Sequence, residues 1–433
     1  MEDFKPNHQY HFEFTGKGTE FFRIWIVNTL LSILTLGIYS AWAKVRTNQY
    51  FYGNTKLDDA SFQYLADPIK ILKGRLIAIT LFISYYLLAN FYPVYGLYFL
   101  IIGLLIIPLL FVLSQSFRMK NTAYRNITFN FHGKIKDSYK IFLIPFIAII
   151  AINVISLTLL PLQEKLLETE ETQTEHNTYN DSVQGTDNSS QQETDNKDAN
   201  KNDNNPPSTD QGSMLSDEEL EQLKQGGIAL FILSLTLMLL FPVWQYLISR
   251  FQLDHTGYGE TQFSFHSSIW QFYKMYLLLL LEVIAISIIF ALCIAGLVSV
   301  LAEGFSTETF QENSGIVIIA IIGYLSIYLY LFAAYSSKHL NLVISSIRID
   351  HIELSSSLTA TGFFWLYLTN TILIGISLGL FIPWVRIRSA RYRLENIQLF
   401  MEQDLNQFTS RQQGDSSAIG EEVGTLFDID VGL

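Results

Sequence analysis

The stretch that decides the fold is residues 94–131, VYGLYFLIIGLLIIPLLFVLSQSFRMKNTAYRNITFNF. Its first part, 94–114, is apolar and long enough, as a helix, to cross about 30 Å of hydrocarbon. Basic residues follow, and then Phe129 and Phe131 alternate with polar residues, as in a half-buried strand. The stretch therefore predicts a membrane helix that ends at a basic, water-facing segment with some β-structure.

Comparable apolar runs recur along the chain. In lipid, backbone polar groups must be satisfied within the segment, which favours helices over isolated strands. Only 16% of the 433 residues are charged, against about 25% in soluble domains. We therefore expect an all-α polytopic protein in a lipid bilayer, with six clear transmembrane helices at 75–92, 94–114, 141–162, 227–248, 275–301 and 315–335.

The distribution of charge predicts orientation. Residues 163–225 contain 16 of the 40 acidic residues and four of the 28 basic ones, so the net charge of −12 belongs to this segment. Basic connections between spans alternate with acidic or neutral ones, and the positive-inside rule places the basic connections and both termini in the cytoplasm. Residues 163–225 contain too few apolar side chains for their burial to offset the conformational entropy lost on folding, which predicts a disordered external loop.

These boundaries divide the chain into five predicted regions. A cytoplasmic segment with a short strand comes first, the two halves of a membrane domain flank the acidic loop, and a disordered cytoplasmic tail ends the chain. The corresponding ranges are 1–20, 21–162, 163–225, 226–400 and 401–433. The single cysteine, Cys293, excludes an internal disulfide.

A repeated pattern lies on the predicted cytoplasmic side. Three segments begin at Asn54, Asn121 and His255, each followed by Thr, then by Leu or Tyr and two aromatic residues at fixed offsets. A pair of spans follows each segment, which predicts three parallel hairpin repeats. These pairs could enclose a cavity or pack into a solid bundle. The aromatic segments, with a further copy at 11–16 and a weaker one at 352–356, predict short strands that pair into a small sheet or lie at headgroup level.

A second repeat joins the ends of the chain. Residues 21–57 match 363–399 without a gap, and the matched pairs are Asn28-Thr29 with Asn370-Thr371, Gly37 with Gly379, Trp42 with Trp384, and Arg46 with Arg388. If the apolar run 362–385 crossed the membrane fully, the arginines after it would face outwards. A re-entrant or interfacial hairpin, broken near each glycine, relieves this conflict. The alternative is an ordinary span that violates the charge rule.

The N-terminal sequence resembles that of a known family. The motifs are FEFTGKGTEFF and VNTLLSILTLGIYSAWAKVRTNQYFYGNT, with Gly74-Arg75 at the entry to the first clear span. They are similar to those of the YjgN-like family of bacterial inner-membrane proteins of unknown function, over most of the chain outside 163–225 and the tail. The resemblance implies a multi-pass protein of the bacterial inner membrane, and it implies no activity, ligand or catalytic residue.

Few residues suggest chemistry. Glu282 is the one carboxylate well inside a clear span, so it is either a proton or cation site or a carboxyl hydrogen-bonded to a neighbouring helix. The two Asn-Thr pairs could line a solute path, although satisfying the backbone of broken helices is the simpler interpretation. His132 and His266 have no nearby ligands for a metal, and they are interpreted as structural.

Two functions from different classes remain. The first is a channel or transporter-like bundle for a small solute or ion, with Glu282 and the Asn-Thr pairs as its polar lining. The second is a non-transporting scaffold or lipid-interacting protein, in which the aromatic and basic cytoplasmic segments contact headgroups. No nucleophile–base set, phosphate loop or nucleic-acid patch is present in the sequence. We therefore predict no metal, cofactor or nucleic-acid partner. Enzymatic activity is the least favoured of the three hypotheses.

Overall fold

The computed structural model describes residues 8–184, 216–302 and 314–412. The chain divides into two compact units. The smaller unit, Leu143–Phe241, contains the outer parts of two helices, where Leu159 packs against Gly226. The larger unit comprises residues 1–142 and 242–433, and its described part contains all the strands that the structure describes.

Helices alternate with pairs of strands along the chain. Their bounds are α1 Gly18–Leu34, α2 Ser40–Gly53, α3 Pro68–Phe91, α4 Pro93–Lys120, α5 Ile135–Gln184, α6 Asp217–Asp254, α7 Ile269–Ala302, α9 Ser314–Ile344, α10 Ala360–Ile376 and α11 Ile382–Glu395. Local chemistry fixes several ends. Asp67 caps α3 by accepting a hydrogen bond from the backbone N–H of Ile69 at 2.9 Å, and Pro68 and Pro93 occupy first helical positions.

Five helices in the described part of the chain are long and apolar enough to cross a membrane. They are Pro68–Phe91, Tyr98–Lys120, Ile135–Ser156, Glu218–Asp254 and Ile269–Gly296. The first five predicted spans each fall mostly within one of these helices. The sixth predicted span, 315–335, lies within α9. Their surfaces carry many exposed apolar side chains, as expected for helices solvated by lipid.

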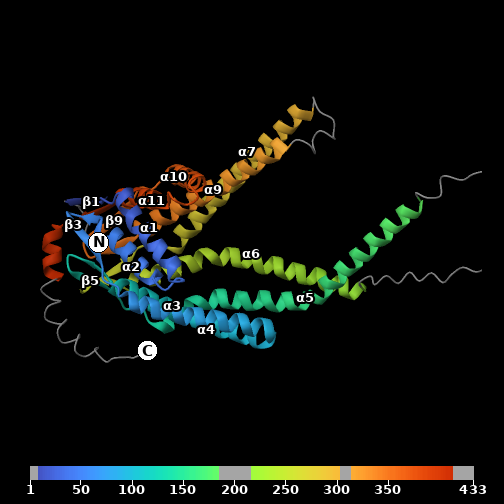
Figure 1. Cartoon of the computed structure of the whole chain (residues 1–433), viewed down its shortest axis with the longest axis horizontal. Coiled ribbons are helices and arrows are strands. Elements are labelled where there is room, and N and C mark those ends of the chain that lie inside the picture. Colours follow the sequence, from blue (N-terminus) through green and yellow to red (C-terminus); the bar gives the residue numbers. More distant parts are fainter. Residues whose placement is uncertain (1–7, 185–215, 303–313, 413–433) are drawn as a thin grey trace, which may run out of the picture. The chain divides into compact units, whose positions relative to one another are not determined.

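Ten strands close into an antiparallel barrel. In chain order they are β1 His8–Phe14, β2 Thr55–Leu57, β3 Ala60–Tyr64, β4 Thr122–Tyr124, β5 Ile127–Phe131, β6 Thr256–Tyr258, β7 Thr261–Phe265, β8 Ile347–Ile349, β9 Ile352–Ser356 and β10 Ile397–Met401. Four consecutive hairpins, β2–β3 to β8–β9, lie side by side. The ends of the chain complete the ring, because β1 pairs with both β10 and β2. Figure 1 shows β1, β3, β5 and β9 gathered together, with α3 and α4 side by side leading away from them.

The hairpin turns have the chemistry that tight turns require. Asp58-Asp59 and Arg125-Asn126 have positive φ at both positions, as in type I′ turns, whose twist matches that of the flanking strands. Gly259 supplies the positive φ of the third hairpin and Asp350 that of the fourth. Closing the ring leaves no strand edge exposed to pair with other chains.

The prediction of an all-α fold is therefore wrong. The strands form a complete ten-stranded barrel, whereas we expected short accessory strands beneath three helical repeats. In all four hairpins the first strand is only three residues long. The alternation of apolar and polar residues is therefore too short to be recognised in the sequence. The last pairing joins His8 to Met401, a contact that no local pattern specifies.

The terminal apolar runs are helical hairpins. Run 21–43 breaks between α1 and α2 at Gly37, and run 362–385 breaks between α10 and α11 at Gly379; both glycines have φ of +91°. Each hairpin begins and ends at the barrel, since Phe14 before α1 pairs with Thr55 after α2. At 17 residues, α1 and α10 are each about 25 Å long, shorter than the hydrocarbon core.

Two predicted boundaries differ from the observed elements. The acidic segment was expected to be unstructured from 163, whereas α5 continues to Gln184. The end of the segment was expected to be helical with Ser216 as its cap, and α6 does start at Asp217, with reciprocal hydrogen bonds between Ser216 and Glu219. The tail was expected to begin at 401, whereas residues 405–412 are helical and pack against the barrel. Residues 185–215 and 413–433 lie outside the described residues.

Candidate functional site

The barrel has an apolar lumen built from equivalent positions of its strands. The third residues of β3, β5, β7 and β9, with Phe12 of β1, form one ring: Phe12, Phe62, Phe129, Phe263 and Leu354. The third residues of the other strands form a second ring: Leu57, Tyr124, Tyr258, Ile349 and Leu399. The two rings line a cavity of about 250 Å³. The lumen is therefore a constriction lined by aromatic and aliphatic side chains.

The two tyrosines of the second ring do not make the lumen polar. The Tyr124 hydroxyl donates to the Leu57 carbonyl at 2.7 Å, and the Tyr258 hydroxyl donates to the Tyr124 carbonyl at 3.0 Å. Burial raises the pKa of Tyr124 to about 12 and also raises the pKa of Tyr258. Both hydroxyls therefore stay protonated and bound to backbone.

A short helix, residues 405–412, packs into the barrel; we call it the plug. Leu405 and Phe408 line the lumen and are 3% and 5% exposed. Polar contacts hold the plug to the hairpin turns. Arg125 donates to Asn406 at 2.7 Å and pairs with Asp58 at 2.6 Å, while Gln412 donates to Thr261 at 2.7 Å and accepts from the Glu260 backbone N–H at 2.9 Å. Leu405 and Phe408 thus border the cavity in the lumen, and these polar contacts fix the orientation of the helix.

Asp404 ties the start of the plug to the barrel. Its carboxylate accepts from the Asn406 backbone N–H and from the Tyr10 hydroxyl, each at 3.1 Å. The Asn406 hydrogen bond, followed by that of Tyr10, lowers the pKa of Asp404 from its ordinary 3.8. Because the folded-state pKa is depressed, this stabilisation is present above pH 3.8 and is lost as the pH falls through the lowered value.

The plug should therefore loosen in acid. We expect hydrogen-exchange protection of the amides at 405–412 to fall, relative to the barrel strands, when the pH drops from 6 to about 3. The Asp404→Asn variant retains a capping side chain without the titration, so its protection should change little over the same range. A wild-type plug whose relative protection is flat with pH would contradict this role of Asp404.

Asn54, Asn121 and His255 join neighbouring hairpins. Each side chain donates back to the carbonyl four residues earlier, at 2.8, 2.7 and 2.9 Å, and so ends its helix. The backbone carbonyl of each residue also accepts a hydrogen bond from the N–H of a residue that comes directly after a neighbouring strand. These donors are Thr15, Leu65 and His132 respectively. Ser346 and Asn396 make the same two bonds in the remaining hairpins. These residues thus connect neighbouring strand pairs of the barrel by hydrogen bonds.

Glu282 has a partner that the sequence did not reveal. The Lys338 ammonium of α9 donates to the Glu282 carboxylate of α7, and the two side chains are 27% and 36% exposed respectively. Lys338 lies beyond the predicted span 315–335 but still inside α9. The second carboxylate oxygen, Oε2, is buried without a hydrogen bond. The pair is neutral overall, and α7 and α9 pack together around it.

The Asn-Thr pairs have different surroundings in the two terminal hairpins. Asn370 is 5% exposed; its amide oxygen accepts from Arg388 at 3.3 Å and its nitrogen donates to Ser389 at 3.2 Å. Asn28 is 4% exposed, and neither its oxygen nor its nitrogen has a hydrogen-bond partner. Thr371 is exposed on α10. The structure therefore does not bring the four residues into one site.

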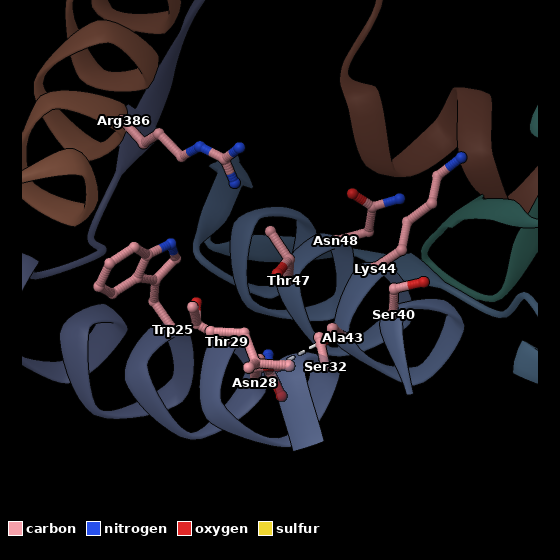
Figure 2. Close-up of a pocket in the computed structure, with 11 residues that line it drawn as sticks. Trp25, Asn28, Thr29, Ser32, Ser40, Ala43, Lys44, Thr47, Asn48 and Arg386 are labelled. Carbon is pink, nitrogen blue, oxygen red and sulfur yellow. Dashed lines mark hydrogen bonds between the residues drawn. The ribbon is translucent and has the colours of Figure 1, made fainter. Parts of the chain in front are cut away.

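Asn28 and Thr29 line an open pocket of about 550 Å³ between α1, α2 and α11 (Figure 2). Lys44 of α2 and Arg386 of α11 border it, and Ser40, Thr47 and Asn48 add polar groups. No acidic residue lines it. Figure 2 shows Arg386 and Lys44 on opposite sides of the view, with Thr47 and Asn48 between them.

The other repeat residues of the terminal hairpins serve packing or lie on the surface. Trp384 lies against Gly18, where an added Cβ would be 2.2 Å from its ring, and stacks obliquely on Phe22 at 5.1 Å. Trp42 contacts Tyr39, and Arg46 is exposed. Glycine at position 18 thus lets α1 and α11 approach closely.

Sequence reasoning missed the lumen and the plug. The aromatic residues of the repeated segments were recognised only as one face of short strands, because their cross-strand partners lie in other hairpins and the ring is closed by strands at opposite ends of the chain. The plug has a local signal: Asp404 precedes Leu405 and Phe408, which lie three residues apart on one helical face. Among the described residues, no group of three His, Cys, Asp or Glu could hold a metal ion.

Comparison with known proteins agrees with the resemblance noted in the sequence. Over 155 residues the chain is 32% identical to the inner membrane protein YjgN of Salmonella typhimurium strain LT2, covering 35% of this chain and 39% of the relative. Over 59 residues it is 42% identical to the inner membrane protein YjgN of Escherichia coli K12, covering 14% of each. The alignments thus span less than two-fifths of these curated relatives. No solved structure matches the chain. A family model described as "Bacterial protein of unknown function (DUF898)" matches residues 9–426, and the chain belongs to that family.

Proposed function

We propose that this protein is a multi-pass inner-membrane channel for a small solute or ion, gated at the lumen of its barrel. The observation that carries the proposal is the pair of stacked apolar rings around the 250 Å³ cavity. An apolar constriction expels water, and ions do not pass without their hydration. Opening then requires the rings to widen and the plug to leave.

The connections between helices and strands suit such a gate. Each helix that ends at Asn54, Asn121 or His255 passes directly into a strand whose third residue lines the lumen. A tilt of that helix therefore moves a ring residue. Side-chain hydrogen bonds hold the plug to the hairpin turns, and water can replace them. Release of the plug therefore requires no change in the barrel fold.

Making the lumen polar should produce a leak. In the full-length variant Phe129→Asn/Phe263→Asn/Leu405→Asp/Phe408→Asp, water can wet the rings, and the carboxylates drive the plug out of the lumen. Liposomes loaded with potassium and containing this variant should release it faster than liposomes with wild-type protein. The matched control changes exposed neighbours instead, Thr128→Asn/Gln407→Asp, and should behave as wild type.

The scaffold alternative predicts equal, slow release from all three proteins. Size-exclusion elution and the thermal midpoint in detergent establish that each variant is folded. A folded lumen variant that releases potassium no faster than the control would exclude the barrel as a gate.

A further inference from the structure

We infer that the pocket between α1, α2 and α11 binds a phosphate group, and that its natural ligand is the headgroup of an anionic phospholipid. The inference concerns a site outside the barrel lumen and does not rest on conduction. Its evidence is the charge of the pocket, an unsatisfied buried amide and the apolar surroundings of the hairpin.

The pocket carries two cations and no compensating acid. Lys44 and Arg386 come from different helices, and neither forms an ion pair or hydrogen bond within the described part of the chain. Thr47 and Asn48 add hydroxyl and amide donors between them. Phosphate oxygens accept several such donors at once, and charge-assisted hydrogen bonds are the strongest kind available.

Asn28 supplies independent evidence of a missing partner. Asn28 is one of the residues that line the pocket, it is 4% exposed, and neither its amide oxygen nor its amide nitrogen has a hydrogen-bond partner. Leaving such a group unsatisfied is costly. The matched Asn370 is satisfied by Arg388 and Ser389 of its own hairpin. Arg46 and Thr47 occupy the corresponding positions in the first terminal hairpin but form no such bonds to Asn28, so its amide is left unsatisfied.

The surroundings favour a lipid over a soluble phosphate. The tip of the hairpin exposes Ile33, Leu34 and Leu36, which are 66%, 77% and 94% exposed, and such apolar side chains belong among acyl chains. Lys44 lies about one turn beyond the start of α2, on the way back to the barrel, the depth at which basic residues meet headgroups. A ligand with a phosphate and acyl chains satisfies both parts of this environment.

Lipid binding to the full-length protein in detergent tests the inference. The probes are fluorescent phosphatidylglycerol and, for comparison, fluorescent phosphatidylcholine. Wild type should prefer phosphatidylglycerol by about tenfold or more, and Lys44→Gln/Arg386→Gln should remove that preference. The control Arg23→Gln/Lys70→Gln loses the same charge from exposed residues outside the pocket, and its affinity should stay within about twofold of wild type.

Asn28→Leu separates binding from structure. Removing an unsatisfied buried amide should leave the thermal midpoint unchanged or higher, while weakening phosphatidylglycerol binding severalfold. A variant that loses both affinity and stability would show that Asn28 has only a structural role, and would overturn its place in the site.

Competition distinguishes the two sources of phosphate. Displacement of the lipid probe by millimolar inorganic phosphate would identify a site for free phosphate compounds, whereas displacement only by unlabelled phosphatidylglycerol would identify a headgroup site. The inference fails if wild type binds the two lipids equally, or if the pocket and control variants lose affinity to the same extent.

Discussion

Replacing Phe21 with alanine should lower the free energy of unfolding by about 3–5 kcal/mol. Phe21 has no exposed surface. Its ring stacks on Tyr50 at 5.3 Å and meets the edge of Phe51 at 4.9 Å. The same cluster includes Phe14 and Ile387, so one side chain ties the end of β1 to α1, α2 and α11. Truncation removes the apolar burial and leaves a cavity that four packed elements cannot close.

The measurement is reversible denaturant unfolding in detergent micelles. Phe82→Ala is the matched control, because Phe82 is 68% exposed on α3 and should cost no more than about 0.5 kcal/mol. The matched residue of the second terminal hairpin, Phe363, also has no exposed surface and should repeat the large loss. Equal losses for Phe21 and Phe82 would show that this cluster does not anchor the hairpin.

The second large effect concerns Glu282 and Lys338. Glu282→Gln should destabilise the fold by about 3 kcal/mol, because the Lys338 ammonium is left without its counter-charge in apolar surroundings. Lys338→Met should cost a similar amount. The double variant should recover most of the loss, since no unpaired charge remains, and the coupling energy of the cycle should be about 3 kcal/mol.

An exposed ion pair serves as the control cycle. Lys140 and Asp137 are 2.8 Å apart with side chains 77% and 38% exposed, and their coupling energy should be much smaller than that of Glu282 with Lys338. Comparable coupling in the two cycles would mean that water reaches Glu282 freely. That result would also return Glu282 to consideration as a proton site, whereas strong coupling identifies it as half of a helix–helix ion pair.

The candidate site was only partly predictable. The repeated positions Asn54, Asn121 and His255 could be recognised in the sequence, because a helix end and the following strand form a local pattern that recurs with fixed spacing. The Glu282 partner could not, because Lys338 belongs to another helix, beyond the end of the predicted span 315–335. The difference in environment between Asn28 and Asn370 was also invisible, since the repeat pairs Arg46 with Arg388, yet only Arg388 hydrogen-bonds to its asparagine.

The sequence by itself determined where the helices run and where they break. Continuous apolar runs specify helices because lipid leaves the backbone no other partner, and Gly37 and Gly379 mark the turns because their positive φ is accessible to glycine. Only the tertiary structure decided that the short strands close into a barrel, that Phe12, Phe62, Phe129, Phe263 and Leu354 meet in one ring, and that Phe408 lines its lumen. These contacts join residues far apart in the chain, and their energy comes from burying side chains against partners that no local period encodes.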